Sequence, residues 1–183
     1  GDHTTLATIG ENAKGKAEII VKEPCIISGI VLADQIFTQY DATLNVKTHF
    51  NDGDRIVANT TCITIEGRLR SMLSCERLVL NCMQRMSGIA TTTRKYVDLL
   101  KGTDTKVLDT RKTTPLLRVL EKEAVRIGGG TNHRFGLFDM ILIKDNHVDY
   151  SGGIVPALKR ANDYRKNLNK PIEILRVGTD SFS

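Results

Sequence analysis

The sequence has no tryptophan, and only 5% of its 183 residues are aromatic. Proteins that bind single-stranded nucleic acid stack bases on aromatic side chains, and this chain is poorly supplied with them. It also lacks any apolar run long enough to cross a membrane. Hydrophobic residues nevertheless make up 40% of the chain, which is ordinary for a globular protein. We therefore expect neither nucleic acid nor membrane among its partners.

Closely spaced cysteine pairs are absent as well. The four cysteines form no C-x-x-C pair and no spacing typical of a zinc site. Cys75 and Cys82 lie about 10 Å apart along a predicted helix, beyond the usual disulfide separation of roughly 6 Å. We expect free thiols, with these two in the core. The N-terminal residues GDHTTLATIG lack the basic start and apolar stretch of a secretory signal, so we expect a cytoplasmic protein.

Positive charge is in excess. The net charge is +5, and the sequence pI is about 9.1. Nucleic acid, an anionic membrane surface or small anions could each account for this excess. Because aromatic residues are scarce, we attribute the charge to a small phosphorylated substrate.

Residues 1–105 have the pattern of an α+β domain. Alternating apolar residues predict short strands, and an apolar stripe at helical spacing predicts a long helix. The strands are expected at residues 17–21, 25–27, 43–50 and 61–66, and the helices at 31–40 and 69–100. Gly67 is expected to end the last strand, and Ser87-Gly88 to kink the long helix or divide it in two.

The later part of the chain is organised around residues 107–147. Val107-Leu108 runs into the polar residues 109–112, and the apolar run 140–143 runs into Lys144 and the polar residues after it. An apolar run that stops in reactive side chains is typical of a buried parallel strand in an α/β barrel, where the site lies at the C-terminal strand ends. We expect both runs to be such strands, facing one mouth.

A helix is predicted between these two runs. Pro115 suits its first turn, and apolar residues recur at helical spacing from Leu117 to Ile127. The glycines at 128–130 are expected to end it and to let the backbone of residues 131–134 approach a ligand closely. A further helix is expected at residues 154–168 and a strand at 171–174.

The same segment gathers basic side chains suited to anions. A guanidinium forks onto a carboxylate or phosphate, whereas an ammonium acts as a compact charge. Having both kinds indicates a small ligand with more than one anionic group. Any one of these residues alone could be part of a solvated surface. The set comprises Arg111, Lys112, His133, Arg134 and Lys144.

Several motifs in this order resemble the quinolinate phosphoribosyltransferase family. They are D-T-R-K-T-T-P at 109–115, G-G-G-x-N-H-R at 128–134 and L-I-K-D-N-H at 142–147, with E-R-L-V-L-N and S-G-I-A-T within 76–91. The resemblance extends from Gly1 to about Ile174. It implies an α/β fold, with an N-terminal α+β open-sandwich domain at 1–105. An α/β barrel of the type II phosphoribosyltransferase kind follows at 106–183 and is incomplete in this chain.

The resemblance also implies an activity. The protein would transfer the 5-phosphoribosyl group of 5-phosphoribosyl 1-diphosphate to quinolinate with decarboxylation. The products would be nicotinate mononucleotide, carbon dioxide and pyrophosphate, in de novo NAD biosynthesis. Mg²⁺ would bind mainly through the diphosphate of the substrate, and no residue is assigned as its ligand. The resemblance further implies a homodimer with a shared active site, with a higher oligomer left open.

By resemblance, Lys112 and Lys144 are catalytic residues. Arg77 falls on the E-R motif and would reach the partner subunit's site to bind a substrate carboxylate, although spacing alone would make it an ordinary exposed arginine. The substrate-binding residues implied by the family are Arg77, Thr110, Arg111, Lys112, His133, Arg134 and Lys144.

The sequence departs from the family near its end. Leu175 stands where the family has the second glutamate of an E-V-E-V strand. Too few residues follow to complete a barrel, and residues 177–183 resemble a later family pattern. We therefore expect an intervening segment to be absent.

Other interpretations stay open at this point. A nicotinate phosphoribosyltransferase-like enzyme would have similar chemistry with one substrate carboxylate, and the incomplete barrel favours a non-catalytic anion-binding remnant. Asp109 and the residues 145–147 could form a metal cluster, but they lack a recognised ligand spacing. We expect instead that Asp109 and Asp145 hold neighbouring basic residues, and His147 could equally be a buried, satisfied histidine.

Overall fold

The computed structural model describes residues 2–168 and 171–176. It forms two compact units, Gly1–Asn132 and His133–Ser183, and each is described by itself. The domain division expected after residue 105 stays a prediction. The family pattern expected at 177–183 lies outside the described residues.

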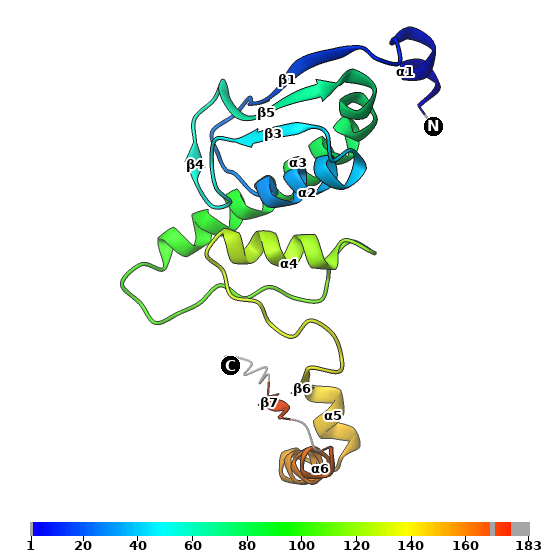
Figure 1. The fold of residues 1–183 in the computed structure, drawn as a ribbon. Coiled ribbons are helices and arrows are strands. Elements are labelled where there is room, and N and C mark those ends of the chain that lie inside the picture. Colours follow the sequence, from blue (N-terminus) through cyan, green and yellow to red (C-terminus); the bar gives the residue numbers. More distant parts are fainter. Residues whose placement is uncertain (1, 169–170, 177–183) are drawn as a thin grey trace. The chain divides into compact units, whose positions relative to one another are not determined.

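The first unit is built on an antiparallel sheet with strand order β1-β5-β3 (Figure 1). Strands β2 and β4 form a second, two-stranded pair. The strands are β1 (Lys14–Val21), β2 (Cys25–Ile26), β3 (Asn45–Thr48), β4 (Arg55–Ile56) and β5 (Thr60–Arg68). The expected strands are therefore all present with shifted ends, and the two-residue β4 was not predicted.

Four helices complete this unit among its described residues: α1 (His3–Thr8), α2 (Ile30–Tyr40), α3 (Leu69–Leu99) and α4 (Arg118–Ile127). Helices α2 and α3 contact the sheet and each other, and α4 packs along α3 (Figure 1). This sheet-on-helices layer confirms the predicted open α+β arrangement. Helix α1 was not predicted; the Asp2 carboxylate caps it by accepting a hydrogen bond from the backbone N–H of Thr5 at 3.1 Å.

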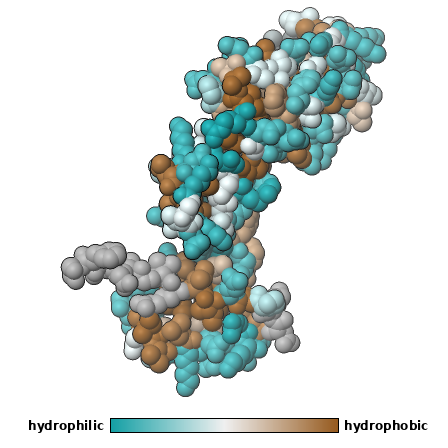
Figure 2. Space-filling view, turned by 90° about the vertical axis from the view of Figure 1, so that its left-hand side faces the viewer, coloured by the Kyte–Doolittle hydropathy of each residue, from teal (hydrophilic) through white to brown (hydrophobic). Residues whose placement is uncertain are grey.

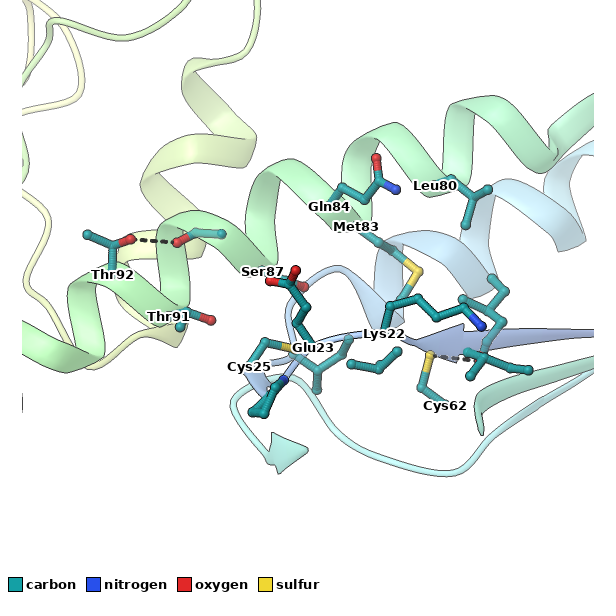
Figure 3. Close-up of a pocket in the computed structure, with 16 residues that line it drawn as sticks. Lys22, Glu23, Cys25, Cys62, Leu80, Met83, Gln84, Ser87, Thr91 and Thr92 are labelled. Carbon is teal, nitrogen blue, oxygen red and sulfur yellow. Dashed lines mark hydrogen bonds between the residues drawn. The ribbon is translucent and has the colours of Figure 1, made fainter. Parts of the chain in front are cut away.

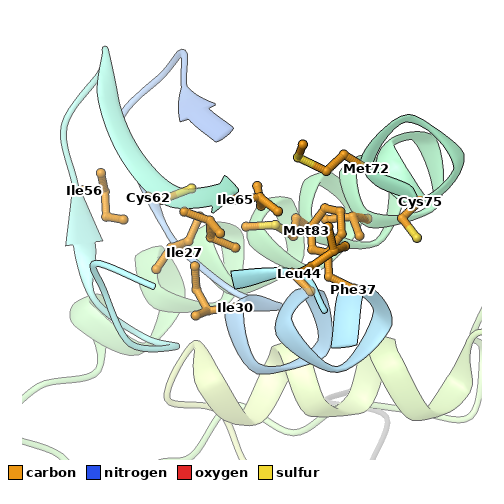
Figure 4. Close-up of a cluster of buried hydrophobic side chains, with 13 residues drawn as sticks. Ile27, Ile30, Phe37, Leu44, Ile56, Cys62, Ile65, Met72, Cys75 and Met83 are labelled. Carbon is orange, nitrogen blue, oxygen red and sulfur yellow. The ribbon is translucent and has the colours of Figure 1, made fainter. Parts of the chain in front are cut away.

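The core lies between β5 and the helices (Figure 4). Ile63 and Val79 are fully buried, because β5 is covered by its neighbouring strands and by α3. All four cysteines are free thiols, as predicted, and burial raises the pKa of each. Cys75 belongs to the core, whereas Cys82 is only half-buried, so that part of the prediction was wrong.

Two expected breaks in this unit do not occur. Gly67 lies inside β5 opposite Gly15, with φ at +146°, and a Cβ there would come within 2.7 Å of Leu44 Cδ2. The glycine thus admits a close side chain and does not end the strand. Helix α3 is not divided at Ser87-Gly88. The Ser87 hydroxyl there donates to the carbonyl of Ser28 at 3.1 Å.

The second unit contains a two-stranded parallel sheet and two helices among its described residues. Strand β6 (Met140–Ile143) pairs with β7 (Glu173–Arg176), and the helices are α5 (Asp145–Tyr150) and α6 (Ile154–Asn167). The strand at 140–143 and the helix from 154 are confirmed, and α5 was not predicted.

The described sheet of this unit does not close into a barrel. Parallel strands are normally covered on both faces, yet Leu175 of β7 is 40% exposed. Elsewhere in the unit, Leu137, Phe138 and Val155 are all more than two-thirds exposed. Figure 2 shows hydrophobic side chains on the surface of this unit. The incomplete barrel predicted from the sequence is therefore confirmed. Within residues 2–168 and 171–176, no helix combines the length and the apolar character needed to cross a membrane.

The buried carboxylate of Asp41 links α2, β5 and α3. It accepts hydrogen bonds from Arg68 Nε at 2.8 Å, from the Ser71 hydroxyl at 2.6 Å and from the Thr43 hydroxyl at 2.7 Å. These donors, Arg68 first, hold the pKa of Asp41 well below its ordinary value. Because the folded pKa is depressed, the stability that Asp41 contributes is present above the unfolded pKa and is lost as the pH falls below it.

We predict that the free energy of unfolding of the wild type exceeds that of an Asp41→Asn variant at pH 5, and that this gap narrows by pH 3. Urea unfolding at each pH measures the gap. Asp104→Asn, which changes an exposed aspartate, should follow the wild type throughout. A gap that stays constant between pH 5 and pH 3 would contradict the prediction.

Candidate active site

The segment that leads into the D-T-R-K motif is not the strand that was expected. Leu108 forms only an isolated parallel bridge with Thr131, and it is 51% exposed. The bridge consists of Thr131 N donating to Val107 O at 2.8 Å and Asp109 N donating to Thr131 O at 3.2 Å. A single isolated bridge is not a strand, and neither Val107 nor Leu108 is buried. The bridge nevertheless brings the start of the motif beside the residues that follow the glycine run.

Helix α4 begins later than expected. Leu116 has φ at +67° and is fully exposed, so the backbone at this point is left-handed and cannot be helical. The helix starts at Arg118, and Pro115 therefore lies in a turn and not in the first helical turn. The motif residues 109–114 consequently form a loop that ends in this turn. We call residues 109–114 the anion loop.

The glycine run ends α4 as predicted, and two of its glycines, Gly128 and Gly130, lie close against α3. Gly128 is the C-cap of α4, and a Cβ there would lie 2.7 Å from the carbonyl oxygen of Ala90. A Cβ on Gly130 would lie 2.9 Å from Thr93 Cγ2. Both contacts are with α3, so these glycines allow close helix packing. The expected approach of residues 131–134 to a ligand stays a prediction. Arg94 of α3 closes the contact by donating from Nε to the carbonyl of Gly128 at 2.8 Å.

The C-terminal end of the anion loop is held by two charged side chains, one from each helix. Arg85 of α3 donates from Nη2 to the Thr114 hydroxyl at 2.7 Å and from Nε to Glu121 Oε1 of α4 at 3.0 Å. The other carboxylate oxygen of Glu121 accepts the backbone N–H of Thr114 at 3.2 Å. The hydroxyl and the backbone N–H of Thr114 are thus both hydrogen-bonded.

The rest of the loop is held by α4. Lys122 donates to the carboxylate of Asp109 at 2.5 Å, and the side chains of both are more than nine-tenths buried. Asp109 thus holds a basic side chain, as had been expected, and that side chain comes from α4. Arg118 donates to the Thr113 hydroxyl at 3.2 Å and to the carbonyl of Arg111 at 3.4 Å.

None of these contacts uses the side chains of Arg111 and Lys112, the basic residues of the loop that are predicted to bind anions. Arg111 is half-buried, and its Nε is shielded from solvent without a hydrogen-bond partner among the described residues. Lys112 is exposed, and its backbone N–H donates to the Thr110 hydroxyl at 3.1 Å. A shielded guanidinium nitrogen without an acceptor costs free energy. An anion at this position would remove the cost.

Arg77 lies on α3, eight residues before Arg85, and is exposed. Among the described residues, no hydrogen bond or ion pair joins it to the anion loop. Among the described residues, the contacts within one chain therefore do not link Arg77 to this loop.

The remaining predicted residues belong to the second unit. His133 and Arg134 are half-buried at its start, and the turn after them is held by Asp139, which accepts the backbone N–H of Gly136 at 2.8 Å. Lys144 is exposed directly after β6. Its backbone N–H donates to Nδ1 of His147 at 2.9 Å. His147 therefore has a hydrogen-bond partner, as expected, but it is exposed and not buried.

Two other possible sites are less suited to the expected ligand. In the part of the chain that the structure describes, no three His, Cys, Asp or Glu side chains are grouped to hold a metal ion. An apolar cavity of about 560 Å³ lies beside α3 in the first unit, lined by Cys25, Cys62 and Met83 among others (Figure 3). Its described lining includes none of the predicted site residues, so it does not match a basic anion site.

The residues that hold the loop were missed in the sequence, although one left a signal. Glu121 lies four residues after Leu117 and three before Ala124, which places it on the apolar stripe of α4. A charged residue on such a stripe indicates a buried partner. Its partner Arg85 lies 36 residues earlier, and no local pattern connects the two.

We predict that Gly128→Ala lowers the free energy of unfolding by about 1–3 kcal/mol, because its Cβ would meet the backbone of α3. The matched control is Gly88→Ala in α3, where a Cβ would meet nothing within 4 Å. That variant should be up to about 1 kcal/mol more stable than the wild type, since alanine favours a helix. Urea unfolding distinguishes the two, and a Gly128→Ala variant as stable as the wild type would refute the steric argument.

Comparison with known proteins supports the resemblance seen in the motifs. The family model for the quinolinate phosphoribosyl transferase N-terminal domain matches residues 2–87, and the model for its C-terminal domain matches residues 89–181. Quinolinate phosphoribosyltransferase [decarboxylating] 2a, mitochondrial, of Nicotiana tabacum is 46% identical over 164 residues, which are 90% of this chain and 46% of the relative.

A bacterial relative and a solved structure agree. The probable nicotinate-nucleotide pyrophosphorylase [carboxylating] of Bacillus subtilis is 45% identical over 161 residues, covering 88% of this chain and 55% of the relative. The crystal structure of NadC from Streptococcus pyogenes superposes with a TM-score of 0.87 at 40% identity, covering 94% of this chain and 61% of that one. The chain spans about half the length of the curated relatives it matches.

Proposed function

This chain belongs to the quinolinate phosphoribosyltransferase family, and from that premise we propose that the intact protein transfers the 5-phosphoribosyl group of 5-phosphoribosyl 1-diphosphate to quinolinate. The reaction releases carbon dioxide and pyrophosphate and forms nicotinate mononucleotide for NAD biosynthesis. The names of its relatives, quinolinate phosphoribosyltransferase [decarboxylating] and nicotinate-nucleotide pyrophosphorylase [carboxylating], support this reaction.

The observation that carries the proposal is the state of the anion loop. Its backbone and hydroxyl groups are bonded to α3 and α4, while Arg111 Nε is shielded and lacks an acceptor. A rigid loop that presents an unpaired guanidinium beside an exposed ammonium is suited to carboxylate and phosphate groups. Quinolinate carries two adjacent carboxylates, and its cosubstrate carries several phosphate groups.

In this proposal the basic residues divide the anionic groups between them. Arg111 and Arg134 bind the carboxylates of quinolinate, with Arg77 supplied by the partner subunit of a homodimer. Lys112 and Lys144 are the catalytic residues, which neutralise charge between quinolinate and the phosphate groups. Thr110 and His133 add hydrogen-bond donors. The family motifs on which these residues fall support the assignment.

The chemistry needs positioning and charge neutralisation and no protein nucleophile. As the bond from the ribose carbon to the diphosphate oxygen breaks, that carbon becomes oxocarbenium-like, and the pyridine nitrogen donates its lone pair to form the new bond. The resulting ring cation stabilises the carbanion left when the neighbouring carboxylate departs as carbon dioxide. A proton from water then completes nicotinate mononucleotide.

Mg²⁺ is part of the proposal as a companion of the substrate. It prefers to keep several waters and to bind phosphate oxygens with few protein carboxylates, which suits a site where no three acidic, His or Cys side chains group among the described residues. When bound, it would neutralise diphosphate charge. The cytoplasm stays the proposed compartment, although the tobacco relative's name places that protein in mitochondria.

We predict that the intact protein, given quinolinate, 5-phosphoribosyl 1-diphosphate and Mg²⁺, forms nicotinate mononucleotide and pyrophosphate. Arg111→Ala should lower kcat/KM by about 100-fold or more, because charged hydrogen bonds to a substrate carboxylate are lost. The matched control is Arg126→Ala, an exposed arginine of α4 that pairs with Glu123. Liquid chromatography of the products measures both variants.

Three outcomes would contradict the proposal. Turnover with nicotinate but not with quinolinate would identify the other phosphoribosyltransferase activity. Quinolinate binding without turnover would identify an anion-binding remnant, the alternative that the incomplete barrel favours. If the folded protein neither binds quinolinate nor turns it over, both the proposed enzyme and the anion-binding remnant are refuted.

A further inference from the structure

We propose that Arg85 and Glu121 are positioning residues that hold the anion loop in its substrate-binding conformation. This inference rests on the proposed function and deepens it. Neither residue belongs to the set expected to contact substrate. Their contacts are instead with Thr114, at the end of the loop that carries Arg111 and Lys112.

Arg85 and Glu121 both hydrogen-bond to one residue of the loop, Thr114. Arg85 donates to the Thr114 hydroxyl at 2.7 Å, and Glu121 accepts the Thr114 backbone N–H at 3.2 Å. The side chains of Arg85 and Glu121 are also bonded to each other, since Arg85 Nε and Nη2 both donate to Glu121 Oε1, at 3.0 and 2.5 Å. Thr114 is thus held through its side chain and its backbone at once, which fixes its orientation as well as its position.

Glu121 is much more buried than Arg85, so the two do not form a simple ion pair on the surface. The side chain of Glu121 is 10% exposed, whereas that of Arg85 is 50% exposed. Burial alone would raise the pKa of Glu121, but hydrogen bonds from Arg85 and Thr114 outweigh it, and the pKa is lowered. Glu121 is therefore an ionised carboxylate on the apolar stripe of α4. A buried charge of this kind is tolerated because its partners satisfy it, and removing one partner leaves it uncompensated.

The other contacts of the loop explain why this one matters for binding. Lys122 holds the beginning of the loop at Asp109, and Arg118 holds the carbonyl of Arg111. The Arg85–Glu121 pair holds the far end. With both ends fixed, the side chains of Arg111 and Lys112 project from a short, bridged segment. Binding sites need this support, because a misplacement of about 1 Å can cost 100-fold in rate.

The experiment compares Arg85→Met, Glu121→Gln and the double variant of the intact protein. The matched controls are Arg126→Met and Glu123→Gln, which break an ion pair on the same helix that does not touch the loop. Steady-state kinetics give KM for quinolinate and kcat. Hydrogen exchange of the peptide spanning residues 109–117 reports loop order without any substrate, and thermal unfolding reports stability.

We expect each single variant to raise KM for quinolinate by roughly 10- to 100-fold and to speed exchange in residues 109–117. The double variant should be no worse than the poorer single one, because both residues act on Thr114. The control variants should match the wild type in all of these measurements. A purely structural role would lower the melting temperature without raising KM at temperatures where the protein is folded.

The outcomes separate this inference from the proposed function. If the wild type turns over quinolinate and the Arg85 and Glu121 variants keep its KM and its exchange rates, the positioning role is refuted. If the wild type shows no activity, the proposed function fails. The exchange data then decide alone whether the pair orders the loop: unchanged exchange in residues 109–117 refutes it, and faster exchange supports it.

Discussion

Helix α4 can lie against α3 only because Gly128 has no Cβ. A methyl group at that position would come within 2.7 Å of a carbonyl oxygen of α3, and the helices would have to separate. Their close contact lets Arg85 of one helix reach Glu121 of the other. It also lets Arg94 cap the end of α4. The conformation of the anion loop therefore depends on this helix contact, although no residue of the contact is expected to meet a substrate.

Buried charges organise the loop, and they do so at a cost. Lys122 and Asp109 are both more than nine-tenths buried, and taking two charges out of water offsets most of their mutual attraction. Apolar residues of similar size could stabilise α4 as well. They could not, however, fix the direction of a polar loop. We interpret the pair, together with Glu121, as the means by which the scaffold orients the side chains that await anions.

Much of the fold could be predicted from local pattern. The strands of the first sheet and helix α3 follow from periodicity, because a buried face leaves a regular signal. Strand β6 follows from its short apolar run. The errors occurred where a long-range contact decided the outcome. Leu108 lies in an apolar pair but has only a bridge to Thr131. Gly67 continues its strand because a neighbouring side chain needs the space.

The sequence by itself determined the family and the chemical character of the candidate site, since motif order and residue type are visible without coordinates. The place of Glu121 on the apolar stripe of α4 was visible there too, but it was missed. Only the tertiary structure decided which partner each charge has, that the glycine run serves helix packing, and that Arg111 Nε is shielded without an acceptor. The reason is physical: burial and pairing depend on residues far apart in the chain, and their contacts exist only once the helices have packed.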